Sequence, residues 1–98
     1  MEINQILSVE KLRDGGSLIV NFQSDDSCSY WLMLPIANFE SENPKFKEPV
    51  LVNRTTSIEV DLSWSSAHAW LNRLATFIND SEDKELVNRM LDIVNENT

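Results

Sequence analysis

The stretch from Ser63 to Asn79 constrains the fold more than any other part of the chain. Ser63 or Ser65 can cap the start of a helix here, because a serine hydroxyl accepts a hydrogen bond from a backbone N–H of the first turn. Apolar residues follow at the three- and four-residue spacing of one helical face, namely Trp64, Ala67, Trp70, Leu71, Leu74 and Ile78, with Phe77 widening the stripe. A face with this much aromatic surface needs a large apolar partner, and we expect that partner to be a sheet.

The residues before this helix have the patterns of β-strands. Residues 3–12 lead to the pair Gly15-Gly16, which suits a tight turn, and residues 17–23 then alternate between apolar and polar side chains. These segments predict a hairpin. Residues 28–34 are apolar on both faces, as is typical of a central strand, and Pro35 ends the run because proline cannot donate to a β-ladder.

The second half of the predicted sheet follows a long connection. Residues 37–49 contain two prolines and alternating charges, which indicates an irregular loop. We expect a short strand at 50–53, a turn at 54–57, and a half-buried strand at 58–62 whose carboxylates point to water.

A second helix is predicted at residues 82–96, because its apolar residues again share one face and Asn79–Ser81 is short enough for a helical hairpin. That face consists of Leu86, Val87, Met90, Leu91 and Val94. Strands followed by helices predict an α+β fold: an antiparallel sheet of four to five strands followed by two C-terminal helices packed on one face. The length predicts a single domain over 1–98, with strands at about 3–62 and the helical hairpin at about 63–96.

The predicted hairpin resembles the opening of a family of small bacterial domains of unknown function. Its first strand has the family's spacing at Ile6, Val9, Leu12 and Asp14, and its second strand matches at Leu18, Val20 and Phe22. The resemblance covers about a quarter of the chain, and the family's later Trp-Pro signature is absent. It implies a fold and no catalytic residue.

Charge and cysteine content narrow the partners and the compartment. Eight basic and sixteen acidic residues give a formal net charge of -8, which opposes direct binding to nucleic acid or to anionic membranes and favours a protein partner with a basic surface. Cys28 is the single cysteine, so no internal disulfide is expected. The charged N-terminal residues lack the apolar core of a signal peptide, and the longest apolar run, 30–37, is too short for a membrane span. We expect a cytoplasmic protein.

Candidate chemistry is sparse. Ser65 and Ser66 lie near His68, but neighbours at a helix start point around the cylinder, and capping is the commoner use of such serines. Cys28 and His68 are too few for a zinc site. The carboxylate pairs Asp25-Asp26 and Glu59/Asp61 could act as acid and base, although a polar turn and a solvated strand face also explain them. We expect no metal, no cofactor and no catalytic residue.

Two sets of residues are predicted to bind a partner. Strand alternation places Trp31 and Met33 on the sheet face opposite the helices, where either the 37–49 loop covers them with Phe39 or Phe46, or a second chain does, a homodimer included. The second set is the acidic face of the last helix, Glu85, Asp92 and Glu96, which could steer a basic partner or only keep the surface solvated.

The sequence therefore favours a non-catalytic acidic protein-interaction module, such as an inhibitor, immunity or antitoxin-like protein or an adaptor. The alternative is a small carboxylate-dependent enzyme. A deep pocket at Asp25, Asp26, Glu59 or Asp61 would favour the enzyme, whereas a flat exposed apolar patch would favour the interaction module.

Overall fold

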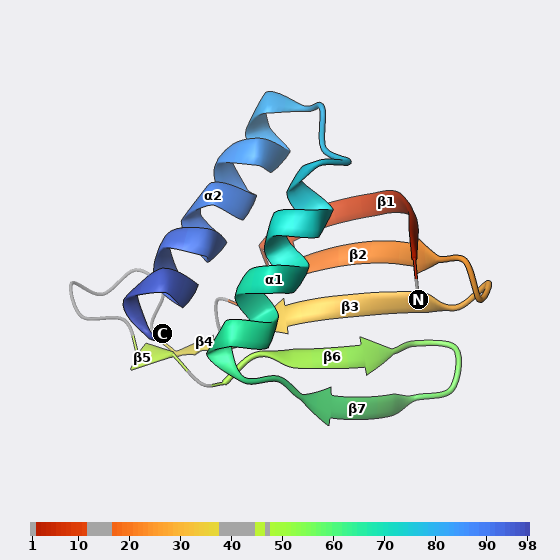
Figure 1. The fold of residues 1–98 in the computed structure, drawn as a ribbon, viewed down its shortest axis with the longest axis horizontal. Helices are drawn as coiled ribbons and strands as arrows, with labels where there is room; N and C mark the ends of the chain where they lie inside the picture. The colour runs from red at the N-terminus through yellow and green to blue at the C-terminus, as the bar shows by residue number, and fades with distance from the viewer. Residues whose placement is uncertain (1, 12–16, 38–44, 47) are drawn as a thin grey trace.

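The main layer of this protein is a five-stranded antiparallel sheet, and two helices pack on one of its faces (Figure 1). The computed structural model describes residues 2–11, 17–37, 45–46 and 48–98. Within them, the five-stranded sheet has the order β1-β2-β3-β6-β7, formed by β1 (Ile3–Lys11), β2 (Leu18–Ser24), β3 (Ser29–Leu34), β6 (Val50–Asn53) and β7 (Ile58–Asp61). The helices α1 (Trp64–Ala75) and α2 (Ser81–Glu96) follow. The predicted α+β architecture is confirmed.

The predicted central strand is β3, which pairs with β2 on one side and β6 on the other. Cys28 lies just outside the strand, and β3 ends at Leu34 before Pro35, as predicted. The predicted hairpin is also present, since β1 and β2 pair antiparallel. Its turn, including Gly15 and Gly16, lies outside the described residues.

The connection between β3 and β6 is more regular than its sequence indicates. Ile36–Ala37 forms β4 and Lys45–Phe46 forms β5, and these short strands pair with each other as a separate two-stranded ladder. The prediction of an irregular loop over 37–49 was wrong at these positions. Two-residue strands leave too short a pattern to be recognised by alternation.

Both helices begin at a capped N-terminus. The Ser63 hydroxyl accepts a hydrogen bond from the backbone N–H of Ser66 at 3.1 Å, which confirms one of the two predicted caps. Asp80 caps α2, since its Oδ1 accepts from the N–H groups of Glu82 and Asp83 at 2.9 and 3.0 Å. Its negative charge also suits the positive end of the helix dipole. Neither helix among the described residues is long and apolar enough to cross a membrane.

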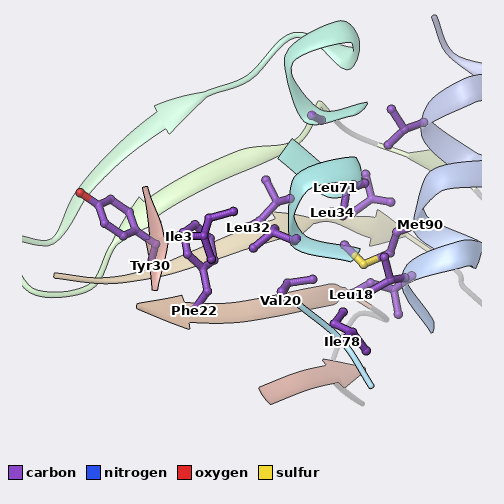
Figure 2. Packing of buried hydrophobic residues seen from close by; sticks show 14 residues of the cluster. Ile3, Leu18, Val20, Phe22, Tyr30, Leu32, Leu34, Leu71, Ile78 and Met90 are labelled. Carbon is purple, nitrogen blue, oxygen red and sulfur yellow. The ribbon is translucent and has the colours of Figure 1, made fainter. Parts of the chain in front are cut away.

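The core lies between the sheet and the two helices. Figure 2 shows side chains of β2 and β3 meeting Leu71 of α1 and Met90 of α2. The residues that are at most 1% exposed in this cluster are Leu18, Val20, Phe22, Leu32, Leu34, Ala67, Leu71, Leu74, Val87, Met90 and Val94. The Phe22 ring stacks on Tyr30, with centroids 5.6 Å apart, and lies 5.7 Å from the Trp70 ring. The helical stripes and the strand alternation therefore meet in one cluster.

The aromatic residues of the first helix are less buried than the sequence indicates. Trp64 and Trp70 pack against the core but stay partly exposed. Phe77 does not widen the helical stripe, because α1 ends at Ala75 and the Phe77 side chain is 43% exposed. Ile78, beyond the helix end, is nevertheless buried. After α1 the chain tightens into a last turn, in which the N–H groups of Phe77 and Ile78 donate to carbonyls three residues back.

The last strand is also more exposed than predicted. Ile58 and Val60 are 60% and 52% exposed, although their alternation with Glu59 and Asp61 predicted a half-buried strand. The carboxylate side chains are exposed, as expected. β7 is the edge strand of the sheet, and the helices lie over the strands nearer to β1 (Figure 1).

Candidate protein-interaction surface

The sheet face turned away from the helices carries the predicted residues Trp31 and Met33. Strand register places the residues of this helix-free face in two rows across the sheet: Ser8, Asn21, Trp31, Val52 and Glu59 in one, and Glu10, Ile19, Met33, Val50 and Asp61 in the other. Trp31 and Met33 are partly exposed, whereas Ile19 is fully buried. The predicted alternation of β3 is correct.

Trp31 is paired with a cation that sequence reasoning missed. The guanidinium carbon of Arg54 lies 4.1 Å from the centroid of the Trp31 ring, which is within cation–π range. The backbone fixes the start of this turn, because the N–H of Arg54 donates to the carbonyl of Ser29 at 2.8 Å. The exposed Arg54 therefore forms one edge of the surface around Trp31. Only the β3–β6 register brings these two residues together, so a local pattern could not have indicated the pair.

Trp31 and its cross-strand neighbour each contain a buried polar atom. Trp31 faces Asn21 on the neighbouring strand. The indole Nε1 of Trp31 and the side-chain oxygen of Asn21 are both buried without a hydrogen-bond partner among the described residues. A buried unpaired polar atom costs about 1–3 kcal/mol, so such atoms are rare in folded proteins. Their occurrence on one cross-strand pair marks this part of the face as energetically unusual.

The prediction that the 37–49 loop covers Trp31 is not tested by the structure. It rests on Phe39 and on the side chain of Phe46, which lie outside what the structure describes. The described end of the connection contains the exposed Glu48 and the buried Pro49. Loop cover and cover by a second chain therefore both stay predictions.

The second predicted set lies on the other side of the molecule. Glu85, Asp92 and Glu96 are exposed on α2, which packs on the opposite face of the sheet from Trp31. The sheet separates the two sets, so they cannot form one continuous contact surface. Any action of these acids on a partner bound at Trp31 is through their field over a distance.

The carboxylates considered for catalysis are divided between a turn and the sheet edge. Asp25 accepts a hydrogen bond from the backbone N–H of Glu2 at 3.1 Å. Asp26 accepts from the Ser24 hydroxyl, from the N–H of Cys28 at 3.0 Å and from the Tyr30 hydroxyl at 2.8 Å. These donors, Ser24 first, lower the pKa of Asp26 from 3.8 to about 2. The pKa of Tyr30 is raised, first because burial disfavours the charged phenolate and second because its hydroxyl donates a hydrogen bond to Asp26. Asp26 thus organises the β2–β3 turn.

This turn predicts a specific loss of stability in acid. The pKa of Asp26 is lower in the folded state than its ordinary value, so its ionised form favours folding above pH 3.8, and this contribution is lost as the pH falls toward about 2. Asp26→Asn should therefore destabilise the protein at neutral pH and lose its difference from wild type across that window. Urea unfolding at a series of pH values measures this. Ser24→Ala, which removes one of the donors to the Asp26 carboxylate, should reduce the same pH dependence. Equal slopes in all three proteins would contradict the role of Asp26.

Ser66 and His68 of the first helix have structural partners close in sequence. The hydroxyl groups of Ser63 and Ser66 lie 3.0 Å apart, and His68 Nδ1 lies 3.2 Å from the Asn72 amide nitrogen. His68 therefore faces Asn72 along the same helix rather than a serine nucleophile. Within the part of the chain that the structure describes, no three His, Cys, Asp or Glu side chains are grouped as metal ligands would be.

A pocket that sequence reasoning missed lies at the C-terminal end of α1. It has a volume of about 320 Å³ and is lined by Glu2, Ile3, Asn72, Arg73, Thr76 and Phe77. The Arg73 guanidinium carbon also lies 5.0 Å from the centroid of the Trp70 ring. None of the carboxylates Asp25, Asp26, Glu59 or Asp61 lines this pocket. The pocket forms where the start of β1 meets the C-terminal end of α1, so its lining joins residues that are far apart in the sequence.

No family model matches this chain, and no curated protein or solved structure is significantly similar to it. The resemblance of the first hairpin to small bacterial domains therefore stays a prediction.

Proposed function

We propose that this protein is a non-catalytic acidic protein-interaction module of the inhibitor, immunity, antitoxin-like or adaptor kind, and that it binds its partner through the helix-free face around Trp31. The observation that carries this proposal is the partly exposed Trp31–Arg54 stack on a sheet face that neither helix covers. Tryptophan and arginine are the residue types most enriched among those that dominate binding energy at interfaces.

The surroundings of the stack support the same function. Met33, Val50 and Val52 add partly exposed apolar surface on this face. A partner that reorients Asn21 or Trp31 on binding can pair the polar atoms that are buried and have no hydrogen-bond partner among the described residues. Binding then recovers a cost that the free protein carries.

The net charge of -8 favours a partner with a basic surface. In this proposal the negative charges of Glu85, Asp92 and Glu96 attract the basic partner from a distance and do not contact it, since they lie on the other side of the sheet. A second copy of the chain is the competing partner for the helix-free face, although like charge opposes its approach. The lone free Cys28 suits the reducing cytoplasm, where we place the protein.

The experiment compares wild type with Trp31→Glu and with Phe77→Glu. Phe77 is a matched control, because it is an exposed aromatic residue away from the helix-free face. Each protein is used for affinity capture from the source organism. A protein retained by wild type and Phe77→Glu but lost with Trp31→Glu is then purified, and its binding is measured by calorimetry. We expect Trp31→Glu to weaken binding by at least about 30-fold, as for a dominant interface residue.

Circular dichroism shows whether each variant is folded, and light scattering shows whether the protein is a monomer or a dimer. Arg54→Ala serves as a second variant, because Arg54 is exposed and its loss should weaken binding while the fold persists. If wild type alone is a dimer and Trp31→Glu is a folded monomer, the helix-free face is a self-contact. If both variants stay folded and bind every captured partner as tightly as wild type does, the proposal is wrong.

A further inference from the structure

The open edge of β7 is a second surface with the features of a binding site. β7 is the last strand in the order of the sheet, and no element is drawn beyond it in Figure 1. All of its residues, Ile58–Asp61, are exposed. An edge strand leaves a row of backbone N–H and C=O groups that another strand can pair with.

The hydrogen bonds next to β7 show which backbone groups point outward. The N–H of Leu62 donates to the carbonyl of Pro49 at 2.8 Å, so the backbone N–H of Leu62 points toward β6. Backbone groups alternate in direction along an antiparallel strand. The backbone N–H and C=O groups of Val60 and Ile58 therefore also point toward β6. Those of Glu59 and Asp61 point to the open edge.

The side chains of β7 divide into an apolar and an acidic face. Val60 extends the row formed by Val20, Leu32 and Leu51, so it lies on the helix-covered side of the sheet. Ile58, two residues away, shares that side. Glu59 and Asp61 point to the helix-free face. An added strand would continue an apolar row on one side and meet two carboxylates on the other.

The opposite edge of the sheet is less suited to strand addition. The register of β1 with β2 is irregular between Ile3 and Gln5 and again between Ile6 and Ser8. Such irregularities bend and twist an edge strand, which hinders regular pairing with a further strand. β7 pairs with β6 without a register shift.

The charge on β7 argues against a second copy as the added strand. In the antiparallel self-pairing that centres β7 on Val60, and so overlaps the two strands most fully, Glu59 of each copy lies opposite Asp61 of the other. Like charges directly opposite each other destabilise a strand pair, whereas opposite charges stabilise it. We propose that β7 accepts, as a sixth strand of the sheet, an extended partner segment in which basic and apolar residues alternate. This goes beyond the proposed function, because it assigns the backbone edge of β7 as a binding site in addition to the face around Trp31.

The test uses the capped peptide Lys-Val-Lys-Val-Lys-Val and the isotope-labelled full chain. Strand addition should shift the amide signals of β7 in NMR spectra and slow hydrogen exchange at Glu59 and Asp61. The amides of Ile58 and Val60 should change less, because they already face β6. Glu59→Lys/Asp61→Lys should bind this peptide about tenfold more weakly and should instead bind Glu-Val-Glu-Val-Glu-Val, since attraction and repulsion exchange places.

A control peptide of the same composition, Lys-Lys-Lys-Val-Val-Val, separates strand addition from general attraction to an acidic protein. It should leave the exchange of Glu59 and Asp61 unchanged. Equal binding of both peptides, signal shifts centred on the acids of α2, or unchanged binding by the charge-reversed protein would each overturn the inference. Such a result leaves the Trp31 experiment unaffected, since that one depends on other side chains and another partner.

Discussion

Replacing Phe22 by alanine should lower the free energy of unfolding by about 3–5 kcal/mol, as for other fully buried phenylalanines. Phe22 is 0% exposed and touches both layers, with Tyr30 beside it in the sheet and Trp70 above it on α1. Alanine would leave a cavity where the sheet meets the helix. Urea unfolding followed by circular dichroism measures the loss, and the melting temperature should fall by about 4–8 °C per kcal/mol for a domain of this size.

Phe77→Ala is the matched control for this change, since it removes the same ring from a side chain that is 43% exposed. We expect it to destabilise the protein far less, because surface changes usually cost little. Trp70→Ala should lie between the two, since Trp70 is partly exposed but packs on Phe22. If Phe22→Ala and Phe77→Ala had equal effects, the core would not lie between the sheet and the helices as described.

The second large effect is expected at Met90, where alanine should cost about 2–5 kcal/mol. Met90 is 0% exposed and projects from α2 into the cluster with Leu71 and Leu34 (Figure 2). The change tests whether the last helix is an integral part of the core. Thermal unfolding and urea unfolding of the same sample provide the measurement.

Met90→Leu distinguishes lost volume from lost chemistry. It keeps nearly the same apolar volume and should cost less than about 1.5 kcal/mol. Asn88→Ala, at an exposed position of the same helix, controls for effects on helix formation. A Met90→Ala protein as stable as Asn88→Ala would mean that α2 contributes little to the core.

Much of the fold follows from local patterns. The stripe of α1 at Ala67, Leu71 and Leu74 and that of α2 at Val87, Met90 and Val94 are the buried faces of these helices. The strands are recognisable for the same reason, because side chains alternate across a strand with a period of two. Caps and breakers such as Ser63 and Pro35 placed the element ends. These features act over a few residues, so a single sequence contains them.

The candidate site is only partly accessible to such reasoning. Alternation along β3 predicts that Trp31 and Met33 share a face, and the structure agrees. The stack of Arg54 on Trp31 joins residues that are distant in sequence, and cross-strand register brings Asn21 beside Trp31. Register is set by how whole strands pair, so no short pattern reports it.

The sequence by itself determined the two helices, the five strands of the main sheet and which side chains share a face, because these depend on periodicity along the chain. Only the tertiary structure decided which faces are covered. Ile58 and Val60 alternate as Val20 and Phe22 do, yet the first pair is more than half exposed and the second fully buried. The difference is position, since β7 lies at the edge of the sheet and β2 under the helices. A periodic pattern specifies the direction of a side chain, whereas burial requires a second element to lie over it.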